Sequence, residues 1–114
     1  MKLKAFTEYM PALTKETQFE TLCEKQGIQV FLFSADWCPD CVFLKTFMEE
    51  LVAEWKQIEF VYVNRDQFPS LCERLAVLGI PSFIAYRDGK ECARLVSTLR
   101  KSRAEVEAFL GGLA

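Results

Sequence analysis

The feature that most constrains the fold is the junction between an apolar run and a pair of cysteines. Residues 28–33 read Ile-Gln-Val-Phe-Leu-Phe, and a short polar turn separates them from Cys38 and Cys41. A short run without regular polar alternation is typical of a strand that is buried on both faces of a partly parallel sheet. Apolar residues then recur at helical spacing over residues 39–56. The junction therefore predicts that Cys38 lies where a central strand passes into a helix.

This position has chemical consequences for the cysteine pair. Cys38 can cap the helix, and Pro39 fits the first helical position, where a missing N–H costs nothing. The unpaired N–H groups and the positive end of the helix dipole favour a thiolate at such a site. Cys41 lies one turn later, where it can close a disulfide. We therefore expect Cys38 to be an exposed nucleophile and Cys41 to be the resolving thiol.

A C-x-x-C pair is also half of many zinc sites, which need four Cys or His ligands. The chain has no histidine and no second pair of this spacing, so we expect no metal and no cofactor. The other three cysteines are expected to be dispensable for turnover. The patterns predict a buried Cys23, a buried or half-buried Cys92 in a strand, and an exposed Cys72, for which a regulatory or oligomer-forming role stays open.

Two further segments give the pair a family context. Residues 37–41, Trp-Cys-Pro-Asp-Cys, resemble the active site of the thioredoxin family, and most of all the thioredoxin-related proteins that carry this motif in place of Trp-Cys-Gly-Pro-Cys. Residues 79–83, Gly-Ile-Pro-Ser-Phe, are similar to the family's Gly-Ile-Pro-Thr segment, whose proline is cis and faces the disulfide. Residues 88–90 resemble the hairpin turn that follows. The resemblance extends from about residue 19 to residue 110.

The resemblance implies an α/β thioredoxin fold for one domain over residues 1–114. This fold is a three-layer α/β/α sandwich with a mixed four- to five-stranded central sheet. The segment 3–10 reads equally as a short edge strand or as a helical turn. By the same resemblance, Trp37, Pro39, Ile80 and Pro81 bind the substrate.

The sequence departs from the family pattern at four positions. Leu32 stands where thioredoxins have a buried aspartate, and Tyr62 stands where they have its lysine partner. The joint loss is physically consistent, since one buried charge without the other would be costly. Thr46 replaces a helix-kinking proline, and Ser97 replaces a glycine of the peptide groove. These differences predict a more selective enzyme than a general thioredoxin.

Three residues beside the cysteines carry open alternatives. Asp40 either only favours the helix start or also tunes the acidity of Cys38, because its negative charge opposes a neighbouring thiolate. Val42 and Phe43 fall off the apolar stripe of their helix. They are either partly buried against a loop or form a docking patch.

The expected function is that of a thiol–disulfide oxidoreductase. Such an enzyme reduces protein or small-molecule disulfides, contributes to redox homeostasis and is recycled by a reductase. Two alternatives remain: a glutaredoxin-like enzyme linked to glutathione, and a binding module in which the dithiol is idle.

Composition indicates which partners and which cell compartment to expect. The chain has 114 residues and a net charge of −2, and neither sign of charge clusters, which disfavours nucleic acid as a partner. No apolar stretch is long enough to span a bilayer, and the first residues lack the apolar core of a secretory signal. An odd number of cysteines suits a reducing compartment. We therefore expect a cytoplasmic monomer.

Overall fold

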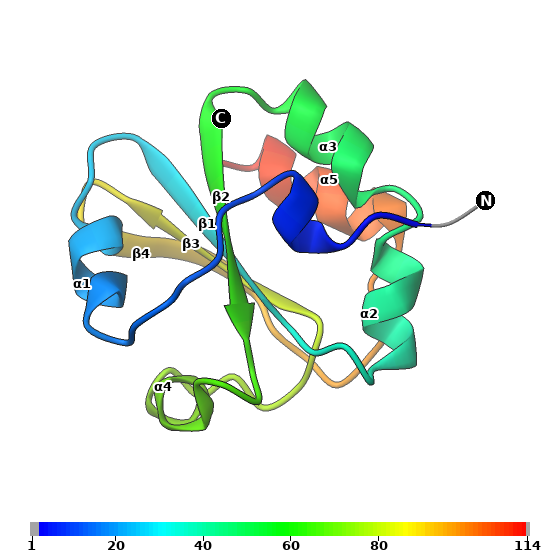
Figure 1. Cartoon of the computed structure of the whole chain (residues 1–114). Coiled ribbons are helices and arrows are strands. Elements are labelled where there is room, and N and C mark those ends of the chain that lie inside the picture. Colours follow the sequence, from blue (N-terminus) through cyan, green and yellow to red (C-terminus); the bar gives the residue numbers. More distant parts are fainter. Residues whose placement is uncertain (1–2, 114) are drawn as a thin grey trace.

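The computed structural model describes residues 3–113, which form a mixed sheet between two layers of helices (Figure 1). The strands follow the order β2-β1-β3-β4 across the sheet. The elements in chain order are the 3-10 helix η1 (Phe6–Glu8), α1 (Gln18–Cys23), β1 (Ile28–Ser34), α2 (Pro39–Leu44), α3 (Met48–Glu54), β2 (Ile58–Asn64), α4 (Pro69–Arg74), β3 (Ser82–Arg87), β4 (Lys90–Leu95) and α5 (Arg103–Gly111).

Strand β1 lies inside the sheet and sets the position of the cysteine pair. It runs parallel to β2 from the Ile28–Ile58 pair to the Ser34–Asn64 pair, and it runs antiparallel to β3. Every residue of β1 after Ile28 is buried. The prediction of a strand covered on both faces is therefore confirmed, and its carboxyl end delivers the chain to Cys38.

Two hydrophobic cores cover the two faces of this sheet. Helices α1 and α4 lie over one face, where Phe19 packs against Phe31 in a buried cluster that also contains Leu71. Helices α2, α3 and α5 lie over the other face, where Leu51 and Val106 are fully buried (Figure 1). The three-layer α/β/α sandwich is thus confirmed.

The segment 3–10 adopts the helical alternative. It forms η1, whose Phe6 ring stacks on Tyr62 with 5.7 Å between ring centroids. Ala12 then makes an isolated parallel bridge to Tyr62. Within the described residues the sheet therefore has four strands, the lower of the two expected numbers.

The single helix expected over residues 39–56 is wrong, because the chain breaks between α2 and α3. The N–H groups of residues 45–47 bond back only three residues, and Phe47 has φ −137°. The Thr46 hydroxyl donates to the Phe43 carbonyl at 2.8 Å. A threonine hydroxyl that bonds to a preceding carbonyl bends a helix. Thr46 therefore marks a bend that the sequence alone did not predict in the absence of proline.

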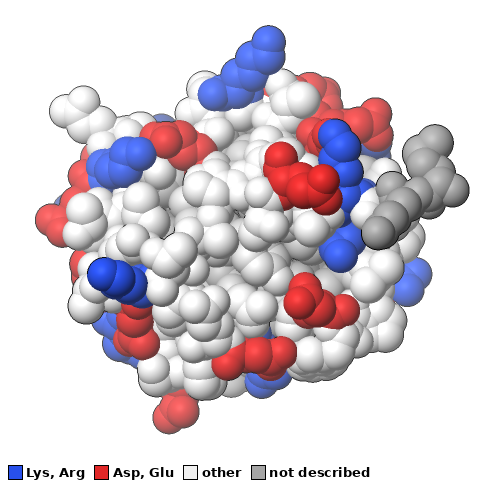
Figure 2. All heavy atoms as spheres, viewed as in Figure 1, with Lys and Arg blue, Asp and Glu red and all other residues white. Residues whose placement is uncertain are grey.

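The charged residues do not form a field of one sign on the face shown in Figure 2. Lys and Arg alternate with Asp and Glu around its edge. Among residues 3–113 no helix has both the length and the apolar character that crossing a bilayer requires.

Candidate active site

Cys38 and Cys41 lie at the first turn of α2, as the sequence predicts. Cys38 is the N-cap residue, with φ −86° and ψ 116°, and Pro39 takes the first helical position. The Cys41 N–H donates to the Cys38 Sγ at 3.3 Å. The cap is thus made by a sulfur atom, and a sulfur that accepts from the helix start is stabilised as an anion.

The expected exposure of Cys38 is wrong. Only 5% of Cys38 is exposed, against 1% of Cys41. The Cys38 Sγ faces the Ile80 carbonyl at 3.8 Å, so the segment at residues 79–81 covers it. Cys38 is nevertheless the more accessible thiol of the pair.

This covering segment is held by close backbone contacts. The Ile80–Pro81 peptide bond is cis, and Ser82 Oγ donates to the Gly79 carbonyl at 2.6 Å. A β-carbon at Gly79 would lie 2.3 Å from the Ser97 carbonyl oxygen, which no side chain tolerates. Gly79 therefore lets the loop at residues 97–101 pack against the segment that faces Cys38.

Four exposed apolar side chains lie on the segments that surround Cys38. Trp37 precedes Cys38, Val42 follows Cys41, Leu78 precedes Gly79, and Leu99 belongs to the loop at residues 97–101. Trp37, Leu78 and Leu99 are 60%, 79% and 71% exposed. We call these four residues the apolar rim. Leu78 and Leu99 were not singled out by the sequence, because their exposure depends on the loop packing at Gly79.

Trp37 is fixed by a contact across the sheet edge. Its Nε1–H donates to the Asp66 carboxylate at 2.7 Å. Asp66 follows β2, so the partner of Trp37 comes from the strand beside β1. This bond holds an exposed aromatic ring in one place next to Cys38.

Burial, and then a hydrogen bond with Cys38, raises the pKa of the Cys41 thiol to about 12. The Ser34 hydroxyl and the Ala35 N–H act in the opposite direction and lower it. At neutral pH Cys41 is consequently a protonated thiol in the reduced pair.

Asp40 has a charged partner that lies sixty positions away in sequence. Arg100 Nε lies 3.0 Å from the Asp40 Oδ1, and the same guanidinium covers the Phe43 ring at 4.2 Å. Phe43 is thus partly buried, as one alternative expected, whereas Val42 is exposed, and a docking role for Val42 stays a prediction. The Arg100 charge offsets part of the Asp40 charge, and the tuning role of Asp40 stays a prediction.

The two positions that differ from the family's charged pair are neighbours in space. Leu32 on β1 pairs with Tyr62 on β2, and both are buried. Burial raises the pKa of the Tyr62 hydroxyl to about 12. A neutral phenol therefore occupies the place of a buried charge.

The remaining cysteines correct two expectations. Cys23 is buried as expected, and burial raises its pKa to about 12. Cys72 is buried rather than exposed, because its face of α4 packs against the sheet. Cys92 is exposed rather than buried, because β4 is an edge strand. Within residues 3–113 no three His, Cys, Asp or Glu side chains are grouped to hold a metal ion.

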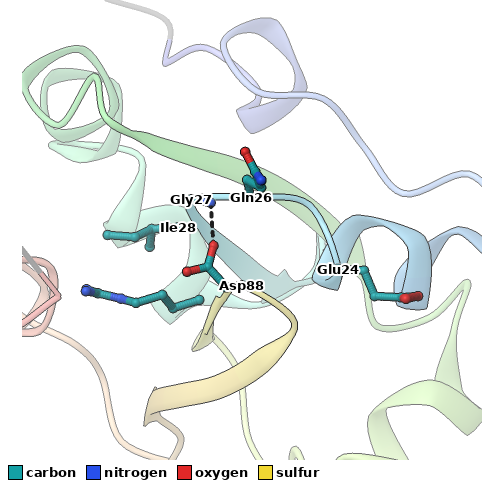
Figure 3. Close-up of a pocket in the computed structure, with 6 residues that line it drawn as sticks. Glu24, Gln26, Gly27, Ile28 and Asp88 are labelled. Atoms are coloured by element: carbon teal, nitrogen blue, oxygen red, sulfur yellow. Dashed lines mark hydrogen bonds between the residues drawn. The ribbon is translucent and has the colours of Figure 1, made fainter.

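A wide cavity of about 660 Å³ lies at the opposite end of β1 from the cysteines (Figure 3). Glu24, Gln26 and Ile28 line it together with the turn at Asp88. The dashed bond in Figure 3 joins the Gly27 N–H to the Asp88 carboxylate at 3.0 Å. This bond ties the start of β1 to the β3–β4 turn, so the polar groups here serve the loop structure.

Comparisons with known proteins agree with this geometry. The family model described as Thioredoxin matches residues 10–110. The Chlamydia caviae protein named Thioredoxin is 37% identical over 70 residues, which are 61% of this chain and 69% of that protein. The Schizosaccharomyces pombe protein named Thioredoxin-2, mitochondrial is 32% identical over 78 residues, which are 68% of this chain and 59% of that protein.

The solved structures show the same fold. An X-ray structure of Fasciola hepatica thioredoxin has a TM-score of 0.81 with 25% identity, over 92% of this chain and 100% of that chain. Oxidised mitochondrial thioredoxin 3 from Saccharomyces cerevisiae has a TM-score of 0.80 with 22% identity, over 91% of this chain and 95% of that chain. The chain therefore belongs to the thioredoxin family of thiol–disulfide oxidoreductases.

Proposed function

We propose that this protein reduces disulfide bonds in other proteins, with Cys38 as the nucleophile and Cys41 as the resolving thiol. The observation that carries the proposal is the cap of α2, in which the Cys41 N–H donates to the Cys38 Sγ. A thiolate at Cys38 gains from this bond, whereas Cys41 has a raised pKa and stays protonated. Cys38 therefore makes the first attack on the substrate, and Cys41 acts in the second step.

The reaction proceeds by two exchanges. The Cys38 thiolate attacks one sulfur of the substrate disulfide, and the other substrate sulfur leaves with the electron pair and takes a proton from solvent. Cys41 then loses its proton to a solvent base and attacks the Cys38 sulfur. The second substrate sulfur leaves, and two electrons have passed from the enzyme dithiol to the substrate. A reductase must return two electrons to the Cys38–Cys41 disulfide.

A protein substrate fits the surroundings of Cys38 better than a small disulfide does. The apolar rim exposes Trp37, Val42, Leu78 and Leu99 on chain segments that adjoin the nearly buried Cys38. Exposed apolar groups gathered on one surface are typical of contacts with another chain. We further propose that Trp37, Pro39, Ile80 and Pro81 line this substrate site, that the protein acts as a monomer, and that it works in the cytoplasm.

The proposal is tested by trapping. The Cys41→Ser variant cannot resolve the mixed disulfide, so it should hold a disulfide-bonded test protein through Cys38, visible as a reductant-sensitive adduct. The Cys38→Ser variant is the matched control and should form no adduct. Absence of an adduct with Cys41→Ser would support an idle dithiol. Turnover of a glutathione-linked disulfide but not of the test protein would instead support the glutaredoxin-like alternative.

A further inference from the structure

The resolving step needs Cys41 as a thiolate, in a place where a thiolate is costly. Cys41 is 1% exposed, and burial is the largest cause of its raised pKa. No carboxylate is buried among the described residues, and the strand register pairs Leu32 with Tyr62. Five groups act on the Cys41 thiol or share its electrostatic surroundings: Cys38, the Ser34 hydroxyl, the Ala35 N–H, Tyr62 and Lys101.

Ser34 stands out in this set because its hydroxyl has no partner. The residue is 0% exposed, at the last position of β1, and Ser34 Oγ has no hydrogen-bond partner of normal geometry among residues 3–113. Its strand neighbour Asn64 does not serve it, because Asn64 Oδ1 accepts from the Asp66 N–H at 2.8 Å. A buried hydroxyl without a partner is destabilising, and it calls for an explanation.

The groups around Ser34 explain why its hydroxyl is buried without a partner. The hydroxyl lies within interaction range of both the Cys41 thiol and the Tyr62 phenol, and it lowers the pKa of each. A neutral thiol is a weak acceptor, so the Ser34 donor gains little while Cys41 is protonated. A thiolate is a charged acceptor, and hydrogen bonds to charged groups are about twice as strong as neutral ones. The bond therefore becomes strong only in the reacting state.

We propose that the Ser34 hydroxyl donates a hydrogen bond to the Cys41 thiolate when Cys41 attacks the mixed disulfide, and that the Tyr62 hydroxyl donates to Ser34 Oγ and holds it in that orientation. This inference rests on the proposed roles of Cys38 and Cys41. Ser34 acts on a reacting atom, whereas Tyr62 is a positioning residue. An interaction that is stronger in the reacting state than in the resting state accelerates the step.

Lys101 is a weaker candidate for stabilising the Cys41 thiolate. Its Nζ is committed to the carbonyl oxygens of Ser97 and Leu99, both at 2.7 Å. These bonds brace the loop that packs on Gly79. The ammonium therefore has a structural role that Ser34 lacks.

The test separates the two exchanges with a chromogenic disulfide, 5,5′-dithiobis(2-nitrobenzoate), mixed with excess reduced enzyme. All variants carry Cys92→Ala, because exposed Cys92 would also react. The first thionitrobenzoate is released by Cys38 and the second by Cys41. In Ser34→Ala we expect an unchanged first phase and a second phase slowed about tenfold at every pH from about 6 to 9, equivalent to about one pKa unit.

Three variants complete the design. Ser34→Thr retains the hydroxyl and should restore the second phase. Tyr62→Phe should slow it less, by about threefold, because it acts through Ser34. Tyr86→Phe is the matched control, since it removes a buried phenol that faces Cys23 instead of Cys41. It should leave both phases unchanged.

The stability of the Ser34→Ala variant gives a second test, because the substitution should slow the second phase without destabilising the fold. Ser34→Ala removes an unpartnered buried hydroxyl, so the reduced variant should be at least as resistant to urea as its parent. A second phase that is unchanged in Ser34→Ala, or slowed equally in Tyr86→Phe, would overturn the inference. Loss of the first phase in the parent would instead refute the proposed role of Cys38.

Discussion

Cys41 and Cys23 lie in the same hydrophobic core, and their environments are alike in three respects. Both are buried, burial raises the pKa of each to about 12, and each faces a hydroxyl, Ser34 for Cys41 and Tyr86 for Cys23. They differ in what adjoins them. Cys41 has a second thiol one turn away at a helix start, whereas Cys23 lies at the end of α1, whose other buried residue is Phe19.

The comparison separates acidity from reactivity. Burial acts on both thiols in the same way, so the pKa of a buried cysteine does not distinguish a redox residue from a core residue. What distinguishes Cys41 is the position of Cys38, which the end of β1 and the cap of α2 determine. The following experiments test this distinction, beginning with the largest expected effect.

Replacing either member of the pair should abolish disulfide reduction, whereas replacing the core cysteine should not. We expect Cys38→Ser and Cys41→Ser to fall to the rate of the uncatalysed exchange, because each lacks one of the two required sulfurs. The triple variant Cys23→Ala, Cys72→Ala, Cys92→Ala should keep its turnover. Loss of turnover in the triple variant, with its circular dichroism spectrum intact, would reveal a further redox step.

The active-site end should also be less tolerant of added volume. Gly79→Ala places a β-carbon 2.3 Å from the Ser97 carbonyl oxygen, so we expect a loss of about 1–3 kcal/mol in the free energy of unfolding. The matched control is Gly111→Ala, whose β-carbon would meet only the Trp55 ring at an ordinary 3.8 Å. Urea denaturation of both variants measures the difference. Equal stability of the two would show that the loop at residues 97–101 shifts freely.

Cys41 and Cys23 should contribute equally to the loss of folding stability at alkaline pH. The folded pKa of each is raised from 9.0 to about 12, so each contributes stability that is complete below pH 9 and is lost as the pH rises toward 12. One such group loses at most about 1.4 kcal/mol for each pH unit in this window. Between pH 8 and pH 10.5 the free energy of unfolding should therefore fall less in Cys23→Ala and in Cys41→Ala than in the parent. The difference should be on the order of 1.4 kcal/mol for each variant.

The measurement is urea denaturation of the reduced protein across this pH range. Cys92→Ala is the control, since Cys92 is exposed, and its slope should equal that of the parent. If only Cys41→Ala changed the slope, the acidity of the two thiols would differ after all, and the comparison would fail.

The smallest effect concerns the charge beside Cys38. We expect Asp40→Asn to increase the thiolate population of Cys38 and to shift the reduction potential toward oxidising values, because a nearby negative charge is removed. Arg100→Gln should act in the opposite direction, because it exposes the Asp40 charge. Both changes should stay below about 1 kcal/mol, as is usual for partly exposed ion pairs.

Thiolate absorbance against pH, with a redox titration against glutathione, measures both variants. Opposite shifts confirm the tuning role of Asp40. A thiolate population that stays constant in Asp40→Asn would leave that residue with a helix-start role only.

Much of the site was predictable because local sequence carries it. The apolar run at residues 28–33, the N-cap at Cys38 and the segment at residues 79–83 each have a local pattern, and all three were placed correctly. The family resemblance also identified Leu32 and Tyr62 as a joint departure, and the strand register places them side by side. Patterns of this kind depend on residues that are close in the chain.

The tertiary structure decided the features that depend on distant segments. Arg100 reaches Asp40 across sixty positions, and the Gly79 segment, packed against the loop at residues 97–101, covers Cys38. The exposure of Cys72 and Cys92 was predicted the wrong way round, because it depends on which face of α4 and which edge of the sheet meet solvent. Burial and charge pairing are sums over neighbours from the whole fold, so a local pattern identifies the reactive residues and only packing determines their surroundings.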